Sequence, residues 1–156
     1  MENQIWLITA ATGGFGESLA KYALSRGDKV VATSRTMKKL NEKFGGESEN
    51  FLPFELKFEG DLQVKFKALV EATQKKFGRI DNLVNNAGYG LLGIVEETSE
   101  ADLRTQFEVN VFAPFLLTQA ALKLMRPQAI KDGGSVDKVV ARIFNLSSIG
   151  GFRTSG

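Results

Sequence analysis

Residues 9–16, with the sequence TAATGGFG, join a short apolar run to a stretch with helical periodicity. The preceding run, residues 5–10, is nearly all apolar, as in a strand that is buried on both faces of a sheet. Residues 14–25 place their apolar side chains on one helical face, and Gly27 follows where a helix can end in a left-handed residue. A strand, a glycine-rich turn and a helix in this order predict the first unit of a parallel α/β sheet.

Strand and helix patterns continue to alternate along the chain. We expect further strands at residues 29–33, 52–58, 80–85 and 139–146, and further helices at 37–44, 63–77 and 99–125. Apolar and polar residues alternate over residues 52–58, which indicates a strand with one less buried face at a sheet edge, where Pro53 is tolerated because an edge strand can lack one donor. Pro114 should bend the last helix or interrupt its hydrogen bonds. The pattern predicts a single α/β domain over residues 1–156, with a doubly wound parallel sheet in the order 3-2-1-4-5.

Composition excludes several classes of function. Apolar residues make up 43% and charged residues 24%, and a net charge of +2 gives no argument for nucleic acid or a membrane surface as a partner. The chain has no cysteine and no histidine, which excludes disulfides, Ser-His-Asp hydrolases and most zinc sites, so we expect no metal. No apolar run approaches the ~20 residues of a membrane span, and the start lacks a secretory pattern, so we expect a cytoplasmic protein.

The turn at residues 9–16 is suited to a phosphate group. Free backbone N–H groups and the positive end of the helix dipole favour an anion, and glycines let it approach the backbone. Thr9, Gly14 and Gly16 fit the pattern T-G-x-x-x-G-x-G, with Ala10 at the first glycine position. If that position needs a positive φ, alanine in place of glycine costs about 1 kcal/mol or more. If the position only needs a small residue, the replacement costs little.

Together with Asn85-Asn86-Ala87-Gly88 and the S-x-x-G serine Ser148, this turn resembles the short-chain dehydrogenase/reductase family. Within the family the chain is similar to the hydroxysteroid-dehydrogenase-like oxidoreductases. The resemblance implies a Rossmann-type fold and a nicotinamide dinucleotide cofactor. It assigns cofactor binding to Thr9, Thr12, Gly14, Phe15, Gly16, Arg35, Asn86, Ala87 and Gly88.

The end of the second strand indicates which dinucleotide is preferred. NAD enzymes usually have an acidic residue there for the ribose 2′-hydroxyl, but residues 33–35 are Thr-Ser-Arg. The guanidinium of Arg35 suits a 2′-phosphate, so we expect NADP(H) in preference to NAD(H), with a merely solvated arginine as the competing interpretation. The family also has an acidic residue that contacts adenine, and Lys57, Glu59 and Asp61 are all candidates for its position.

The resemblance covers only part of the family's catalytic group. It implies that Ser148 positions the substrate oxygen and that Asn110, in the long helix, anchors a water relay. The tyrosine that transfers the proton has no counterpart, because neither Tyr22 nor Tyr89 has a lysine four residues later. The chain ends before that motif and before the sixth and seventh strands, so we expect the 156 residues alone to be inactive.

Two functions are therefore considered. The first is an NADP(H)-dependent oxidoreductase that interconverts a carbonyl and a secondary alcohol in a small molecule by hydride transfer. The alternative is a non-catalytic, truncated module that binds a nucleotide or a protein partner. The family also implies a homodimer or homotetramer through the long helix, whose buried face we assign to Phe107, Val111 and Phe115. Residues 128–140 are longer and more charged than the family's link, and the sequence gives them no function.

Overall fold

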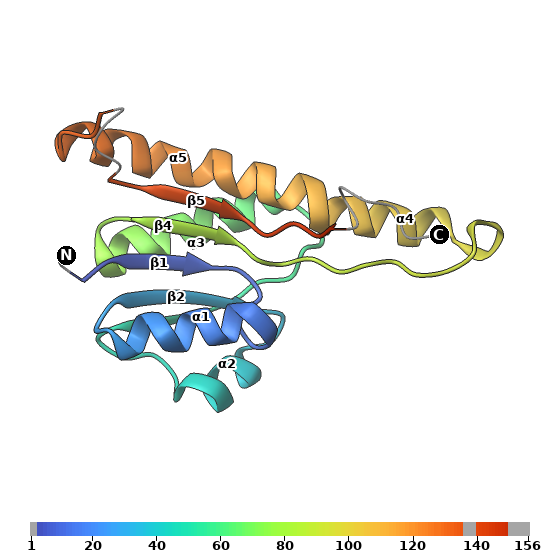
Figure 1. Ribbon diagram of the computed structural model, residues 1–156, viewed down its shortest axis with the longest axis horizontal. Coiled ribbons are helices and arrows are strands. Elements are labelled where there is room, and N and C mark those ends of the chain that lie inside the picture. Colours follow the sequence, from blue (N-terminus) through green and yellow to red (C-terminus); the bar gives the residue numbers. More distant parts are fainter. Residues whose placement is uncertain (1–2, 136–139, 150–156) are drawn as a thin grey trace.

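The computed structural model describes residues 3–135 and 140–149 (Figure 1). Within these residues, five parallel strands form one sheet in the order β3-β2-β1-β4-β5. The class and strand order predicted from the sequence are confirmed. The strands are β1 (Ile5–Ile8), β2 (Lys29–Ser34), β3 (Phe51–Glu55), β4 (Asn82–Asn85) and β5 (Arg142–Asn145).

Helices cover both faces of the sheet. In Figure 1, α1 (Gly14–Ser25) crosses in front of the sheet and α3 (Leu62–Phe77) lies behind it. The front core contains Ile8 and Leu40, with Leu40 supplied by α2 (Met37–Phe44). The rear core contains Leu7 and Phe66 and includes residues of α5 (Ala113–Lys131). Since Leu7 and Ile8 are both fully buried, the apolar run before the turn is a strand with two covered faces, as predicted.

β3 lies at the edge of the sheet, as its alternating pattern predicted, but it is shorter than expected. Pro53 pairs only with Ala32 of β2, so its missing N–H leaves no ladder bond unmade. The strand ends at Glu55, although the Leu56 N–H still donates to the carbonyl of Ser34 at 2.8 Å. The alternating pattern continued past the strand because Leu56 and Phe58 pack against the rear core. β4 and β5 are also shorter than predicted.

The long helix is divided where Pro114 predicted an interruption. It consists of α4 (Glu100–Phe107), a π-helical turn η2 (Glu108–Phe112) and α5, and it follows the short helix η1 (Val95–Glu97). Ser99 caps α4 by accepting a hydrogen bond from the Asp102 N–H at 3.1 Å, as predicted. At the C-terminal side of η2, the Ala113 N–H donates to the Glu108 carbonyl, five residues back. A proline at position 114 has no N–H to continue the α pattern, so the turn widens.

Two expectations about the long helix were wrong. It continues to Lys131 instead of ending near residue 125, and its last turn is held by Gln128, which exchanges two hydrogen bonds with the backbone of Ile80 at 3.1 and 3.0 Å. Its buried face is formed by Ala113, Leu117, Ala121 and Met125. Phe107, Val111 and Phe115 are instead 49%, 49% and 63% exposed.

Part of the segment at residues 128–140 also has a structural explanation. Residues 128–131 complete α5, and Asp132 accepts a hydrogen bond from Arg79 at 2.7 Å. Arg79 also bonds to Asp81, whose other carboxylate oxygen accepts the Ile5 N–H at 2.9 Å. This network joins the end of α5 to the amino end of the sheet. Across residues 3–135 and 140–149, no helix has the length and hydrophobicity of a membrane span.

Candidate functional site

The loop at residues 9–13 is anchored to the end of β2. The Ala11 N–H donates to the Thr33 carbonyl at 2.8 Å, and the Ala10 N–H donates to the Thr33 hydroxyl at 3.2 Å. The hydroxyl groups of Thr12 and Ser34 lie 3.1 Å apart. These contacts hold the loop at the carboxyl end of the sheet, where the strand order reverses between β1 and β4. In doubly wound sheets this position receives the ligand.

Three glycines make one side of the loop open and the other side closely packed. Gly13 precedes α1 without a side-chain cap, and an added Cβ at Gly13 or Gly14 would meet no atom within 4 Å. Gly14 also has a φ of +52°, a conformation that favours glycine. A Cβ at Gly16, in contrast, would lie 2.5 Å from Asn86 Nδ2 and 2.8 Å from the Ala10 carbonyl oxygen. The start of α1 is therefore open to an anion on one side and closely packed on the other, which fits a dinucleotide pyrophosphate.

Ala10 adopts the more costly of its two possible conformations. Its φ is +52°, and it is the only residue other than glycine with a positive φ among those described. The left-handed region costs an L-residue about 1–2 kcal/mol. The first glycine position of the pattern therefore requires positive φ here, and alanine occupies it under strain.

Thr9 and Asn86 join the two turns. The Thr9 hydroxyl accepts hydrogen bonds from the N–H groups of Asn86 and Ala87, both at 2.9 Å. In return, Asn86 Nδ2 donates to the carbonyls of Thr9 and Ala10 at 2.9 and 3.1 Å. Thr9 is only 2% exposed, so its hydroxyl positions the turns from beneath. Asn86 and Ala87 are half-buried, whereas Gly88 and Phe15 are exposed.

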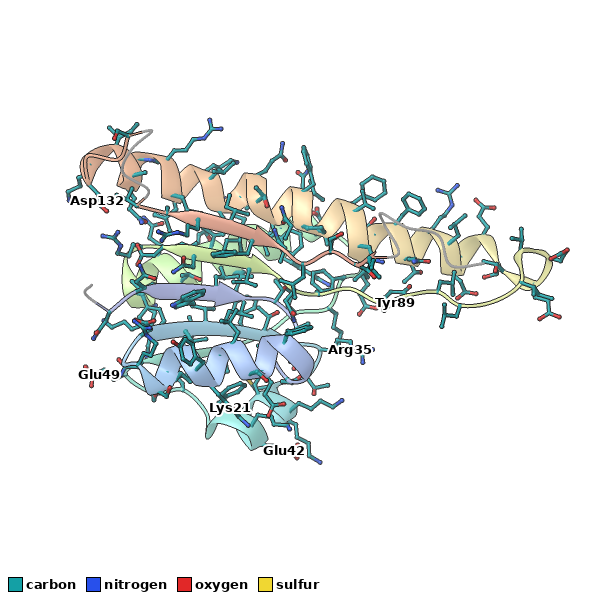
Figure 2. The ribbon with its side chains drawn as sticks, viewed as in Figure 1. Lys21, Arg35, Glu42, Glu49, Tyr89 and Asp132 are labelled. Atoms are coloured by element: carbon teal, nitrogen blue, oxygen red, sulfur yellow. The ribbon has the colours of Figure 1, made fainter. Side chains whose placement is uncertain are left out.

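Arg35 directly follows β2 and is exposed, and Figure 2 shows it with Tyr89 on the side of the sheet toward which the strands point. A carboxylate that the sequence pattern did not reveal, that of Glu55, lies at the same carboxyl end of the sheet. Glu55 is the last residue of β3 and pairs with Ser34, and its Oε2 accepts the Met37 N–H at the start of α2 at 2.9 Å. The register of the parallel strands would have revealed Glu55, because the last residues of neighbouring parallel strands lie side by side at the carboxyl end of the sheet.

A second carboxylate lies in the first turn of α1. Glu17 bonds to Lys21 at 2.6 Å and to Lys43 of α2 at 3.1 Å. The hydrogen bond from Lys21, followed by that from Lys43, lowers the pKa of Glu17 below its ordinary value. Both ammonium groups compensate the negative charge that Glu17 would otherwise present near the open start of the helix.

The candidates for adenine contact lie in the loop between β3 and α3. Asp61 caps α3 by accepting the Val64 N–H at 3.1 Å. Lys65 donates to the carbonyls of Lys57 and Glu59, which holds the loop together. All three candidates are exposed, so the assignment stays a prediction. A groove of about 880 Å³ between α3 and α5 includes Asp61, but it includes none of the residues that the family resemblance assigns to cofactor binding.

Asn110 and Ser148 also lie toward the carboxyl end of the sheet, and they belong to different elements. Asn110 lies in η2, and its carboxamide accepts the Tyr89 N–H at 3.1 Å and donates to the Tyr89 carbonyl at 2.7 Å. A Cβ at Gly88 would lie 3.4 Å from Asn110 Oδ1, so this contact adjoins the turn after β4. Ser148 follows β5 and is exposed. The Asn110 side chain thus holds the backbone of Tyr89 in place. The role of Ser148 stays a prediction.

The chain was compared with known proteins. The family model described as short chain dehydrogenase matches residues 4–155. Oxidoreductase BOA17 of Botryotinia fuckeliana is 36% identical over 151 residues, which cover 95% of this chain and 50% of that protein. An uncharacterized oxidoreductase of Thermotoga maritima is 35% identical over 156 residues, covering 96% of this chain and 55% of that protein. The chain spans about half the length of these curated relatives.

Solved structures agree with this result. A short-chain dehydrogenase from Streptomyces avermitilis aligns with a TM-score of 0.82 and 32% identity, covering 98% of this chain and 52% of that one. A 3-ketoacyl-(acyl-carrier-protein) reductase from Brucella melitensis, complexed with NADH, aligns with a TM-score of 0.83 and 29% identity, covering 96% and 58%.

Proposed function

Because this chain belongs to the short-chain dehydrogenase family, we propose that it is the cofactor-binding part of an NADP(H)-dependent oxidoreductase. The reaction is the interconversion of a carbonyl and a secondary alcohol in a small molecule, with the nicotinamide supplying or accepting the hydride when bound. The observation that carries the proposal is the open start of α1, where Gly13 and Gly14 leave free space beside uncapped backbone N–H groups.

The residues around that opening have distinct tasks in the proposal. The backbone at Gly14 and Phe15 faces the pyrophosphate, and Gly16 allows α1 to pack against Asn86. Thr12 lies beside Ser34 at the entrance to the adenosine side. Ala87 and Gly88 leave room along the adenosine. Thr9 acts through its hydrogen bonds to the turn at residues 86–87.

Arg35 provides the test of the NADP(H) preference. A guanidinium that bonds to a 2′-phosphate contributes about 1.5–3 kcal/mol, so Arg35→Ala should weaken NADPH binding by about 10- to 150-fold and leave NADH binding unchanged. Lys38→Ala is the matched control, because it also removes one exposed positive charge near the start of α2. Equal losses for both coenzymes, or no loss, would refute the assignment.

Asn110 and Ser148 are the catalytic residues that we propose within these 156 residues. Ser148 orients the substrate oxygen, and Asn110 anchors the water relay while its side chain holds Tyr89. Proton transfer by a positioned group contributes about 10²- to 10⁴-fold, and no Y-x-x-x-K motif occurs in the sequence. We therefore expect this chain to bind coenzyme without normal turnover. Turnover at the rate of a complete family member would contradict that expectation.

The exposed side chains of Phe107, Val111 and Phe115 support an association through the long helix, as a homodimer or homotetramer. Sedimentation of the full chain tests this part. A monomer at concentrations well above micromolar would exclude the association.

A further inference from the structure

A small cavity lies beneath the turn that follows β4, between the sheet and the start of α5. Its volume is about 10 Å³, and its lining includes Asn85, Val109, Ala113, Pro114 and Leu117. A cavity needs about 10–15 Å³ to hold one water molecule, provided that polar partners are present. The size of this cavity therefore matches a single water molecule, and its polar lining decides whether one is retained.

Asn85 contributes the first polar partner. The residue is 5% exposed, and its Nδ2 donates to Thr118 Oγ1 at 3.1 Å and to Asn145 Oδ1 at 2.7 Å. Its Oδ1 is buried and accepts no hydrogen bond from the described residues. An unpaired buried acceptor costs about 1–3 kcal/mol. Rotating the carboxamide by half a turn would only replace the unpaired acceptor with an unpaired donor, so either orientation requires a partner.

Val109 contributes the second partner through its backbone. In an α-helix the Ala113 N–H would donate to the Val109 carbonyl, but in η2 it donates to the Glu108 carbonyl. In a continued π pattern the donor to Val109 would be residue 114, and a proline there has no N–H. The Val109 carbonyl thus lacks both its α-helical donor and a π-helical donor. Such a carbonyl needs another donor when it is buried.

We propose that one buried water molecule occupies this cavity and donates one hydrogen bond to Asn85 Oδ1 and the other to the Val109 carbonyl oxygen. The unpaired Asn85 Oδ1, a helix carbonyl that lacks its α-helical and π-helical donors, and space for one molecule together support a single bridging water. Buried waters of this kind bond to polar groups that the protein leaves unpaired.

This water is a positioning element for the candidate site. Asn85 directly precedes Asn86, which holds the loop after β1. Val109 directly precedes Asn110, which holds the backbone of Tyr89. The water joins the end of β4 to the π-helical turn, so it fixes the spacing between the two segments. The inference holds whether or not the chain binds NADP(H).

Nuclear magnetic resonance of the full chain tests the proposal. A water held for longer than nanoseconds gives cross-peaks to nearby methyl groups, with a sign that differs from that of surface water. We expect such cross-peaks at the methyls of Val109, Ala113 and Leu117. A native protein without them, or a crystal structure in which a protein donor bonds to Asn85 Oδ1, would overturn the proposal.

A pair of variants tests the location. Ala113→Val fills the cavity and should abolish the cross-peaks, since Ala113 is 2% exposed and lines it. Ala121→Val adds the same bulk to the same buried face of α5 but outside the cavity lining, and should retain them. Persistence of the cross-peaks in folded Ala113→Val protein would contradict the location. If that variant does not fold, the measurement on the native chain still decides the question.

Discussion

Replacing Gly16 with alanine tests the packing that holds α1 against the turn after β4. The new Cβ would lie 2.5 Å from Asn86 Nδ2 and 2.8 Å from the Ala10 carbonyl oxygen, so Asn86 must move. Overpacking costs about 1–3 kcal/mol, and each lost hydrogen bond of Asn86 costs about 1 kcal/mol. Alanine returns about 1 kcal/mol of helix propensity. The net loss is about 2 kcal/mol, which lowers Tm by roughly 4–8 °C.

The assay is urea unfolding followed by circular dichroism, with thermal unfolding as a second measurement. Gly13→Ala is the matched control: its backbone is extended, with a φ of −169°, and the added Cβ meets nothing within 4 Å. We expect that control to remain within about 0.5 kcal/mol of the native chain. If Gly16→Ala is as stable as Gly13→Ala, the close contact between α1 and Asn86 does not exist in solution.

Three other substitutions test neighbouring contacts. Ala10→Gly removes about 1–2 kcal/mol of left-handed backbone strain, but it adds about 0.4–1 kcal/mol of conformational entropy to the unfolded chain. We therefore expect the free energy of unfolding in urea to rise by about 0.5–1 kcal/mol, and a decrease would argue against the strain. Thr9→Val leaves the Ala87 N–H without its acceptor and removes one of the two acceptors of the Asn86 N–H, so it should cost about 1–3 kcal/mol, whereas Thr9→Ser should retain most of the stability. Glu55→Gln removes a negative charge at the carboxyl end of the sheet, where Arg35 also lies. In calorimetry at low salt, we expect NADPH binding to become tighter by up to about 1 kcal/mol and NADH binding to stay unchanged. An equal effect on both coenzymes would show that Glu55 does not discriminate between them.

The sequence predicted the sheet because local patterns encode its strands. Continuous apolar runs indicated the strands with two covered faces, and the alternation at residues 52–58 indicated the edge strand, where Pro53 is tolerated. Pro114 marked the interruption of the long helix, because a missing N–H acts on the turn in which it stands. These signals depend on neighbours within a few residues, so they can be read without the fold.

Contacts between distant residues could not be read in this way. The end of α5 depends on Gln128 bonding to Ile80, 48 residues away, and a local pattern cannot include that contact. The same holds for Glu55, which reaches the candidate site only through the register of β3 on β2. The exposed face of the long helix was misassigned because Phe107, Val111 and Phe115 are apolar, and hydrophobicity alone does not say which apolar stripe faces the sheet.

The proposed function requires that the open start of α1 receives the pyrophosphate of a nicotinamide dinucleotide. Its most direct test is a titration of the isotope-labelled chain with NADPH, followed through the backbone amide resonances. We expect saturable shifts that are largest at Gly13, Gly14 and Phe15, where the backbone is open and no side chain caps the helix. Absence of binding in folded protein, or shifts confined to the groove between α3 and α5, would contradict it.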